Sequence, residues 1–227
     1  MGILDLFFLK SCLGCNRSGR YICEDCLRKV RIPLAVCPEC LRVSINGMTH
    51  PKCLRQEGLN GHVSLWNYEG VVRRAILTLK YKHAKDIAKE LSEYITRKLP
   101  RGIFKLKDPI LVPIPLFWLR ENWRGFNQSE LVGKMVAESF GWRFEPKLLV
   151  RSKMKVPQTD LKREERLLNV RGIFSLNPKF SSSLTQNSYI LFDDVWTTGS
   201  TLKEAASVLK RNGARKVFSL TLARGVS

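Results

Sequence analysis

Apolar residues recur at helical spacing in the chain that follows residue 61. In two successive groups, each apolar residue has another one three or four positions away. The groups are Val72, Ala75, Ile76 and Leu79, and then Ile87, Ala88, Leu91 and Ile95. Residues spaced in this way share one face of an α-helix, so the pattern predicts two amphipathic helices. A third helix is predicted after Asn127, which stands three residues before Glu130 as in a helix-start box, and this helix ends at Gly141.

Short continuous apolar runs alternate with these helices. Residues 110–115 (ILVPIP) and 189–195 (YILFDDV) are typical of buried strands. Further strands are predicted at 147–151, 172–176 and 216–223, and a further helix at 201–211. Strands that alternate with helices favour a mainly parallel sheet with helices on both faces, so the sequence predicts an α/β fold.

The cysteines are confined to the N-terminal part of the chain. All seven precede residue 54, namely Cys12, Cys15, Cys23, Cys26, Cys37, Cys40 and Cys53. Six of them form three Cys-x-x-Cys pairs, and an odd count without a signal peptide argues against disulfides and for a bound metal. We therefore expect a small cysteine-rich zinc-binding module over residues 1–60, similar to a double zinc ribbon, and an α/β domain over residues 61–227.

Two Cys-x-x-Cys turns supply four thiolates, the number that a tetrahedral Zn²⁺ site needs. Taken in order along the chain, the ligands of the two sites would be Cys12, Cys15, Cys23 and Cys26, and then Cys37, Cys40, His50 and Cys53. The alternatives are a crossed pairing of the first and third turns, and a His50 that is only a bystander, so the chain would hold one or two zinc ions. Closed cysteine sites leave no open coordination position, so the metal is expected to be structural.

The chain of 227 residues is strongly basic, with a formal net charge of +19 and a pI near 10.0. Such a charge suggests a polyanionic partner such as nucleic acid, a phosphorylated ligand or an anionic membrane surface, and a basic but passive surface is the alternative. No apolar run approaches the roughly 18 residues of a membrane helix. The N-terminal MGILDLFFLK is expected to pack Leu4, Phe7 and Phe8 against the body, so we expect a cytoplasmic protein without a membrane span.

Two carboxylates stand at the end of an apolar run in YILFDDVWTTGST, residues 189–201. In parallel sheets ligands bind at the carboxyl ends of the strands, and the start of the helix that follows can bind a phosphate. Adjacent carboxylates accept hydrogen bonds from vicinal hydroxyls, so a phosphorylated sugar with a cis-diol is the expected ligand; an ordinary turn with two aspartates is the alternative. The candidate binding residues are Asp193, Asp194, Thr197, Thr198, Gly199, Ser200 and Thr201.

This stretch resembles the phosphoribosyl pyrophosphate (PRPP) motif of type I phosphoribosyltransferases, in which an apolar strand is followed by two acids, an apolar pair and Thr-Thr-Gly. The resemblance implies a phosphoribosyltransferase-type sheet flanked by helices. It also implies that Asp193 and Asp194 hold the ribose hydroxyls and that residues 197–201 hold the 5-phosphate. A Mg²⁺ ion would accompany the pyrophosphate, bound largely through ligand oxygens and water.

Residues 112–130 (VPIPLFWLRENWRGFNQSE) resemble the signature of the ComF/GntX family, the competence-protein F group. Residues 151–174, the Cys-x-x-Cys pairs and the LDLFF start also match, so the similarity covers nearly the whole chain in the family's order. The resemblance places residues 112–115 where transferases have their pyrophosphate-binding loop, and it makes Arg120 and Arg124 candidate pyrophosphate or phosphodiester contacts. His50 stands where many relatives have cysteine.

Cations gather in two stretches that could track a sugar-phosphate backbone. The candidate DNA-binding residues are Arg73, Arg74, Lys80, Lys82, Arg151, Lys153, Lys155, Arg163 and Arg166. Aromatic residues near the acid pair in sequence could stack on exposed bases or could belong to the core, and these are Trp118, Trp123, Phe126 and Trp196.

The family resemblance implies a role in natural transformation. In the first hypothesis the protein is a competence factor for DNA uptake that handles incoming single-stranded DNA in the cytoplasm, beside a helicase and recombination proteins, and binds PRPP. In the second it is an active phosphoribosyltransferase that releases pyrophosphate from PRPP onto an unidentified acceptor. A zinc-ribbon adaptor is a third reading. The sequence assigns no catalytic residue, so enzymatic turnover stays open.

Overall fold

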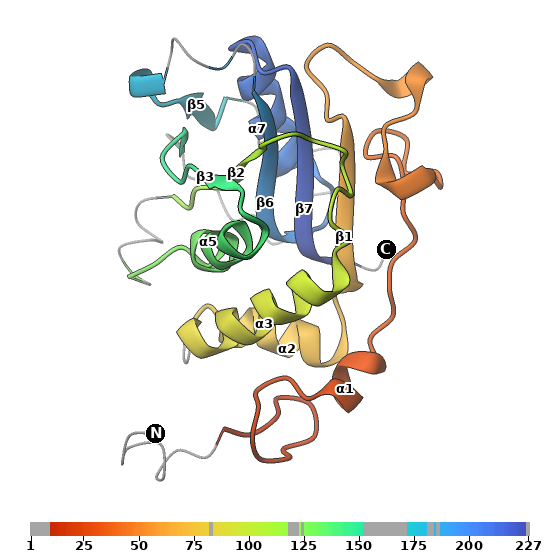
Figure 1. Ribbon diagram of the computed structural model, residues 1–227, viewed down its shortest axis with the longest axis vertical. Helices are drawn as coiled ribbons and strands as arrows, with labels where there is room; N and C mark the ends of the chain where they lie inside the picture. Colours follow the sequence, from red (N-terminus) through yellow and green to blue (C-terminus); the bar gives the residue numbers. More distant parts are fainter. Residues whose placement is uncertain are drawn as a thin grey trace, which may run out of the picture.

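The computed structural model describes residues 10–81, 84–117, 123, 125–151, 172–180, 184 and 187–225. Its centre is a five-stranded sheet in which every neighbouring pair of strands is parallel (Figure 1). The strand order is β1-β7-β6-β2-β3. The strands are β1 (Gly61–Asn67), β2 (Ile110–Pro113), β3 (Arg143–Phe144), β6 (Ser188–Trp196) and β7 (Lys216–Arg224). The predicted parallel sheet is confirmed.

Helices cover both faces of this sheet, as the sequence predicts. The helices are α2 (Gly70–Thr78), α3 (Ala84–Lys98), α5 (Gln128–Phe140) and α7 (Ser200–Arg211). Successive residues of β6 point to opposite faces. Ile190 and Phe192 pack in one core cluster with α2, α3 and α5, whereas Tyr189 and Leu191 pack in a second cluster with α7. Figure 1 shows α2, α3 and α5 on the side of the sheet that faces away from α7.

Two predicted strands do not join the main sheet. Strands β4 (Leu149–Arg151) and β5 (Phe174–Leu176) pair with each other in an antiparallel ribbon. The ribbon packs against the α7 face, where Leu149 and Phe174 are buried. Strand β1 was not predicted, although its residues include the alternation His62, Val63, Ser64, Leu65 that is typical of a strand.

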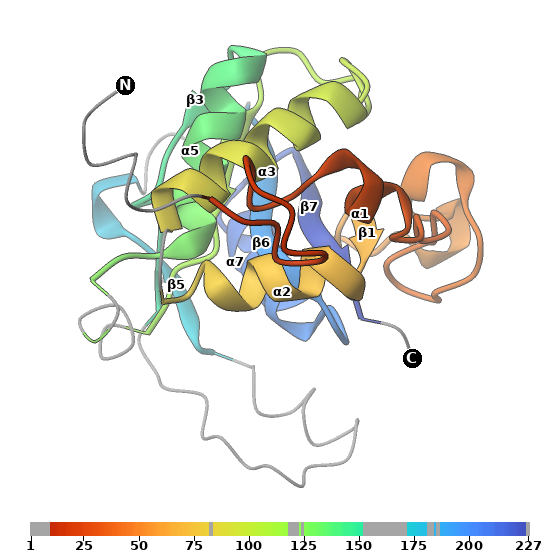
Figure 2. The same ribbon diagram turned by 90° about the horizontal axis from the view of Figure 1, so that it is seen from below.

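The cysteine-rich region forms two loops that dock at different places on the α/β body. It contains only short helices, which are α1 (Glu24–Arg28), η2 (Ile45–Gly47) and η3 (Pro51–Cys53). The first loop lies beside α2 and α3, and the second lies beside β1 (Figures 1 and 2). Between them the chain runs along the edge strand, where the Asn67 N–H donates to the Arg31 carbonyl (2.8 Å). The division at residue 60 stays a prediction.

Buried polar contacts fix each cysteine loop to a helix. Glu90, on α3, accepts hydrogen bonds from the backbone N–H groups of Tyr21 (3.1 Å) and Ile22 (2.8 Å) in the first loop. Glu39 of the second loop forms an ion pair with Lys203 of α7 (3.2 Å). Within the described part of the chain, no helix is long and apolar enough to span a bilayer.

Candidate functional site

The two predicted acids lie at the carboxyl end of the central strand β6, where the first turn of α5 contacts both of them. The Ser129 hydroxyl donates to Asp193 Oδ1 (3.1 Å), and the Gln128 side-chain amide donates to Asp194 Oδ2 (3.2 Å). Both carboxylates are half-buried. Because β6 lies between β7 and β2, the acids face the edge of the sheet at which α/β proteins bind their ligands.

The local sequence explains why α5 begins at this place. Asn127 is the N-cap, and its side-chain oxygen accepts the Ser129 N–H (3.0 Å). Its amide nitrogen donates to the Ile114 carbonyl just beyond β2 (3.0 Å). The cap therefore fastens the start of α5 to the strand next to β6. The sequence signalled this helix start, but it did not signal that Gln128 and Ser129 hold the acids.

A lysine from the turn that follows α2 contacts the acid pair. The Lys80 ammonium lies 3.3 Å from Asp194 Oδ2, and both side chains are largely shielded from solvent. Burial raises the pKa of Asp193 to about 7, and the charge of Asp194 acts in the same direction against the hydrogen bonds from Asp194 N–H and Ser129. Asp194 is thus paired with a cation, while Asp193 is only partly ionised near pH 7. Hydrogen bonds from hydroxyl donors, or a cation, would stabilise the ionised form of Asp193.

The turn after β6 is shaped by a glycine packed on an indole ring. Gly199 has a φ of +74°, and a β-carbon there would lie 2.1 Å from the Trp196 ring. The Thr198 and Ser200 hydroxyls are 3.0 Å apart, and Ser200 is the first residue of α7. The N-cap is Gly199, which has no side chain, and the Ser200 N–H donates weakly to the Thr198 hydroxyl (3.4 Å). The N–H groups of this first turn and the positive end of the helix dipole can hold an anion.

Replacing Gly199 with alanine is expected to destabilise the protein by roughly 2–4 kcal/mol, because the methyl group adds a clash to an unfavourable φ. Gly141→Ala is the matched control, since Gly141 has a φ of +68° and no atom within 4 Å of the added carbon. Its cost should be only about 1 kcal/mol of backbone strain. Urea denaturation of both variants measures the difference. Equal losses would contradict the packing of Gly199 on Trp196.

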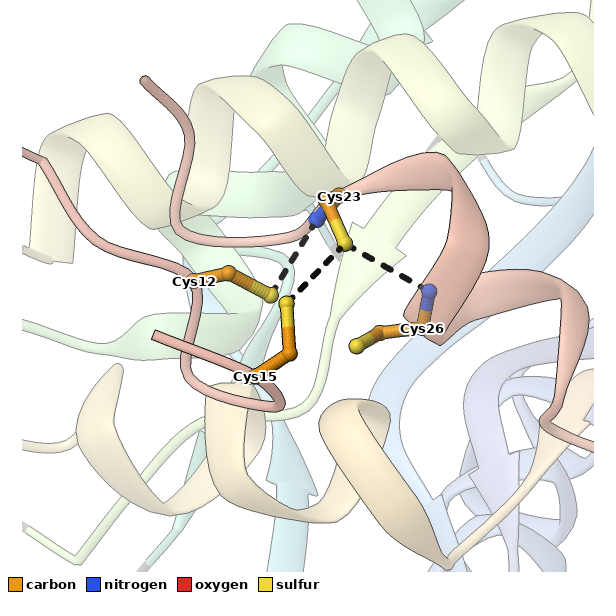
Figure 3. A group of neighbouring side chains, drawn as sticks. All are labelled: Cys12, Cys15, Cys23 and Cys26. Carbon is orange, nitrogen blue, oxygen red and sulfur yellow. Dashed lines mark hydrogen bonds between the residues drawn. The ribbon is translucent and has the colours of Figure 1, made fainter. Parts of the chain in front are cut away.

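The first cysteine group is arranged as a tetrahedral metal site requires. The sulfur atoms of Cys12, Cys15, Cys23 and Cys26 all lie within 4.8 Å of one another (Figure 3). Backbone N–H groups of Gly14 (3.3 Å) and Cys23 (3.5 Å) point at the Cys12 sulfur, as expected around a metal-bound thiolate. This all-thiolate set fits Zn²⁺, and it is closed, so the metal would be structural.

The second group consists of Cys37, Cys40, His50 and Cys53, whose ligand atoms also lie within 4.8 Å of one another. The His50 Nδ1 atom lies 3.4 Å from the Cys40 sulfur, and Nε2 lies 3.1 Å from the Val43 carbonyl. A ligating histidine commonly donates its other ring N–H to such a carbonyl. The arrangement favours His50 as a ligand over His50 as a bystander. Each of the two groups consists of ligands that are consecutive along the chain. The alternative in which the first and third Cys-x-x-Cys turns share one metal is therefore wrong.

Curated proteins of similar sequence share almost the full length of this chain. "DNA utilization protein YhgH" of Salmonella typhimurium is 31% identical over 211 residues, which is 89% of this chain and 90% of that protein. The chain belongs to the ComF/YhgH family. "Competence protein F" of Haemophilus influenzae is 26% identical over 96% of this chain and 98% of its own length. "Competence protein ComFC" of Bacillus subtilis is 29% identical over 96% and 88% of the two chains.

Solved structures that resemble this ComF/YhgH protein include a hypoxanthine phosphoribosyltransferase from Staphylococcus aureus, with a TM-score of 0.35 and 14% identity over 66% of this chain and 71% of that one. Glutamine PRPP amidotransferase from B. subtilis has a TM-score of 0.38 and 17% identity over 59% and 25% of the two chains. No family model matches the sequence.

The predicted DNA-binding cations of this ComF/YhgH protein are only partly described. Arg120 and Arg124 lie outside the described residues, as do Lys82, Lys153, Lys155, Arg163 and Arg166. Arg73 lies over the Tyr68 ring (5.8 Å to its centroid), and Arg74 donates to the Leu13 carbonyl of the first cysteine loop (2.7 Å). Arg151 lies over the Phe174 ring (5.7 Å). Of the four described cations, Lys80 alone contacts the acid pair.

Of the aromatic residues named from the sequence, Trp118 lies outside the described residues, and the described ones differ in exposure. Trp196 is buried beneath the Gly199 turn, so for this residue the core alternative holds. Trp123 is 73% exposed and Tyr81 is 63% exposed, and their rings meet edge to face at 6.2 Å. Tyr81 directly follows Lys80, whose ammonium contacts Asp194, so this aromatic pair is linked to the acids through that lysine. The sequence singled out Trp123 but not Tyr81.

Proposed function

We propose that this protein is a DNA-uptake factor that handles single-stranded DNA in the cytoplasm and binds PRPP through the end of β6 and the start of α7. The observation that carries the proposal is the acid pair at the end of β6, which contacts Lys80 and is followed in the chain by the start of α7, together with an exposed aromatic pair next to Lys80. The names of the relatives, DNA utilization protein and competence protein, support the DNA role.

In this proposal the acids and the turn bind different parts of the sugar phosphate. Asp193 and Asp194 accept hydrogen bonds from the vicinal ribose hydroxyls. The N–H groups and hydroxyls of residues 197–201 receive the 5-phosphate, and the positive helix end favours the anion. A Mg²⁺ ion would enter with the pyrophosphate, bound mostly by ligand oxygens and water. Lys80 would then be shared between Asp194 and the ligand's phosphates.

Single-stranded DNA would cross the same edge of the protein. Exposed aromatic rings bind bases of any identity by stacking, and cations bind the phosphates. Tyr81 and Trp123 supply rings beside Lys80, and Arg73 is an exposed cation on the neighbouring helix. The net charge of +19 would strengthen association with the strand and make it dependent on salt.

The second candidate function is an active phosphoribosyltransferase. The observation that favours it is Asp193, because a carboxyl group with a pKa near 7 can exchange a proton with a bound ligand. Loss of pyrophosphate from PRPP would produce an oxocarbenium-like state at the anomeric carbon, which an acceptor would then attack. The residues around the acids define no acceptor.

The test is a titration of labelled single-stranded DNA in the presence and absence of PRPP and Mg²⁺. We expect the affinity to fall by an order of magnitude or more between about 50 and 200 mM salt. We also expect PRPP to alter DNA affinity in the wild type but not in Asp193→Asn/Asp194→Asn. The double variant Tyr81→Ala/Trp123→Ala should lose about 10-fold or more in DNA affinity and keep its PRPP affinity.

A tryptophan away from the aromatic pair provides the control. Trp142→Ala removes a half-buried ring that stacks on Phe140, and it should leave DNA affinity close to that of the wild type. Absence of DNA binding together with retained PRPP binding would refute DNA handling. Release of pyrophosphate from PRPP, followed with a range of base and sugar acceptors, would establish the transferase instead.

A further inference from the structure

A cavity separate from the acid pair opens at the β1 edge of the sheet. It lies between residues 32–36, strand β1 and the end of α3, and its volume is about 200 Å³. Most of its walls are aliphatic, with Val36, Val63, Leu65 and Ile103 among the lining residues. Lys98 and Arg224 also line it. Pockets with apolar walls and a few convergent polar groups are where proteins bind small molecules.

The two cations have no acidic partner among the described residues. Lys98 donates to the Leu65 carbonyl (2.6 Å) and lies over the Trp66 ring, and Arg224 donates weakly to the Leu34 carbonyl (3.5 Å). Both side chains are half-buried, and burial lowers the pKa of Lys98 to about 8 and lowers the pKa of Arg224 as well. A partly desolvated cation without a counter-ion is disfavoured, so both would be stabilised by an anion in the cavity.

The remaining polar groups of the cavity do not supply that anion. Burial, and then the charge of Arg224, lowers the pKa of His62 to about 3, so its ring is neutral. Its two nitrogens lie 2.9 Å from the Ser219 hydroxyl and 2.7 Å from the Ser64 hydroxyl. Ser64 in turn lies 2.7 Å from the Thr221 hydroxyl. These side chains form hydrogen bonds with one another and carry no charge. Lys98 and Arg224 are therefore the groups that would bind the charge of a ligand.

We propose that this cavity binds a small carboxylate with an apolar body, such as an aromatic or branched aliphatic acid. The aliphatic walls suit the body of such a ligand, and the two cations suit its carboxylate. The volume of the cavity is below the roughly 300–1,000 Å³ of pockets for drug-sized ligands, which limits the ligand to about the size of benzoate.

Trp196 provides a natural reporter for binding. The His62 ring, which lines the cavity, stacks on the Trp196 indole with 3.9 Å between the ring centroids. The same indole lies beneath Gly199. The indole N–H signal of Trp196 in ¹⁵N–¹H spectra should therefore shift when the cavity is filled. Val63 and Leu65 amide signals would shift with it.

The experiment titrates benzoate, benzamide and inorganic phosphate into the full-length protein. We expect saturable shifts with benzoate and at least about 10-fold weaker binding of neutral benzamide, because a hydrogen-bonded charge pair is lost. Lys98→Met and Arg224→Met should each weaken benzoate binding by about 10-fold or more. Lys210→Met is the matched control, since burial also lowers the pKa of Lys210, which donates to the Arg215 carbonyl far from the cavity (2.9 Å).

A second kind of variant tests the proposal even if the variants of Lys98 and Arg224 do not fold. Ala35 is an exposed residue that lines the cavity, and Ala35→Phe should block benzoate binding with both cations in place. The proposal is overturned if benzoate gives no saturable shift, or if benzamide binds as well as benzoate. Binding that survives in Ala35→Phe, or that phosphate abolishes by competition at equal concentration, would also overturn it.

Discussion

Asp193→Asn is expected to make the folded protein more stable at pH 8 while it removes most of the PRPP affinity. Burial and the neighbouring charge of Asp194 raise the pKa of Asp193 to about 7, so at pH 8 the fold contains a carboxylate that it disfavours. The neutral asparagine removes that penalty and should add about 1–2 kcal/mol to the free energy of unfolding. The same change should weaken PRPP binding by about 10- to 100-fold, because the hydroxyls lose a charged acceptor.

The sign of the pH dependence follows from the raised pKa. The folded protein holds the Asp193 proton up to a pKa of about 7, whereas the unfolded chain loses it near the ordinary aspartate pKa of 3.8. The wild type should therefore gain stability relative to Asp193→Asn as the pH falls from 8 to 6. The advantage of the variant should be largest at pH 8 and should shrink at pH 6. Urea unfolding at the two pH values measures this difference.

Asp194→Asn should behave differently, although the two residues are adjacent. Asp194 is the partner of Lys80, so its replacement leaves a shielded ammonium without a carboxylate. We expect no gain in stability from this variant, and a comparable loss of PRPP affinity. Asp86→Asn is a control for the chemical change itself, because Asp86 is an exposed carboxylate that is ion-paired to Lys10 (3.1 Å). If the three substitutions changed the free energy of unfolding equally at pH 8, the proposed penalty for ionising Asp193 in the folded protein would be contradicted.

The features that the sequence predicted are those that depend on neighbours along the chain. The helical spacing of Val72 to Leu79, the cap at Asn127 and the apolar run before Asp193 each occupy one local segment, and each appears in the structure. The cysteine groups were predictable for a similar reason, since Cys-x-x-Cys spacing alone brings two thiolates to one metal.

The features that the sequence did not predict depend on contacts between distant segments. Lys80 and Gln128 meet at Asp194 only because α2 and α5 cover the same face of the sheet. Strand β1 mixes polar with apolar residues, and its place at the edge of the sheet follows only from its parallel pairing with β7. Trp196 lies two residues after the acids and would suit base stacking, yet it is buried beneath the turn at Gly199. Each of these outcomes is a property of packing.

The two cysteine groups are expected to contribute unequally to the stability of the protein, because their loops pack differently against the α/β body. Cys12, Tyr21 and Ile22 belong to the same core cluster as α2 and α3. The second loop is attached to α7 by polar contacts, such as Lys203 with Glu39 (3.2 Å) and Ser207 with Glu57 (2.6 Å). Loss of metal from the first group should therefore disturb the main core, whereas loss from the second should remain local.

Cys12→Ser is accordingly expected to lower the free energy of unfolding by roughly 3–5 kcal/mol, because it removes both a metal and a buried core side chain. Cys53→Ser should cost clearly less, since Cys53 lies in the second loop and outside both core clusters. Zinc content measured by atomic spectroscopy should be two ions per chain in the wild type and one in each variant. Thermal unfolding of the same samples gives the order of stability.

Variants of His50 test directly whether this residue is a zinc ligand of the second group. His50→Cys replaces an imidazole with a thiolate and keeps four ligands, so the second zinc should be retained. His50→Ala leaves three ligands and should lose most of that zinc, as Cys53→Ser does. Retention of two ions in His50→Ala would show that the histidine is not a ligand. An equal loss of stability in Cys12→Ser and Cys53→Ser would show that the first loop stabilises the core no more than the second loop does.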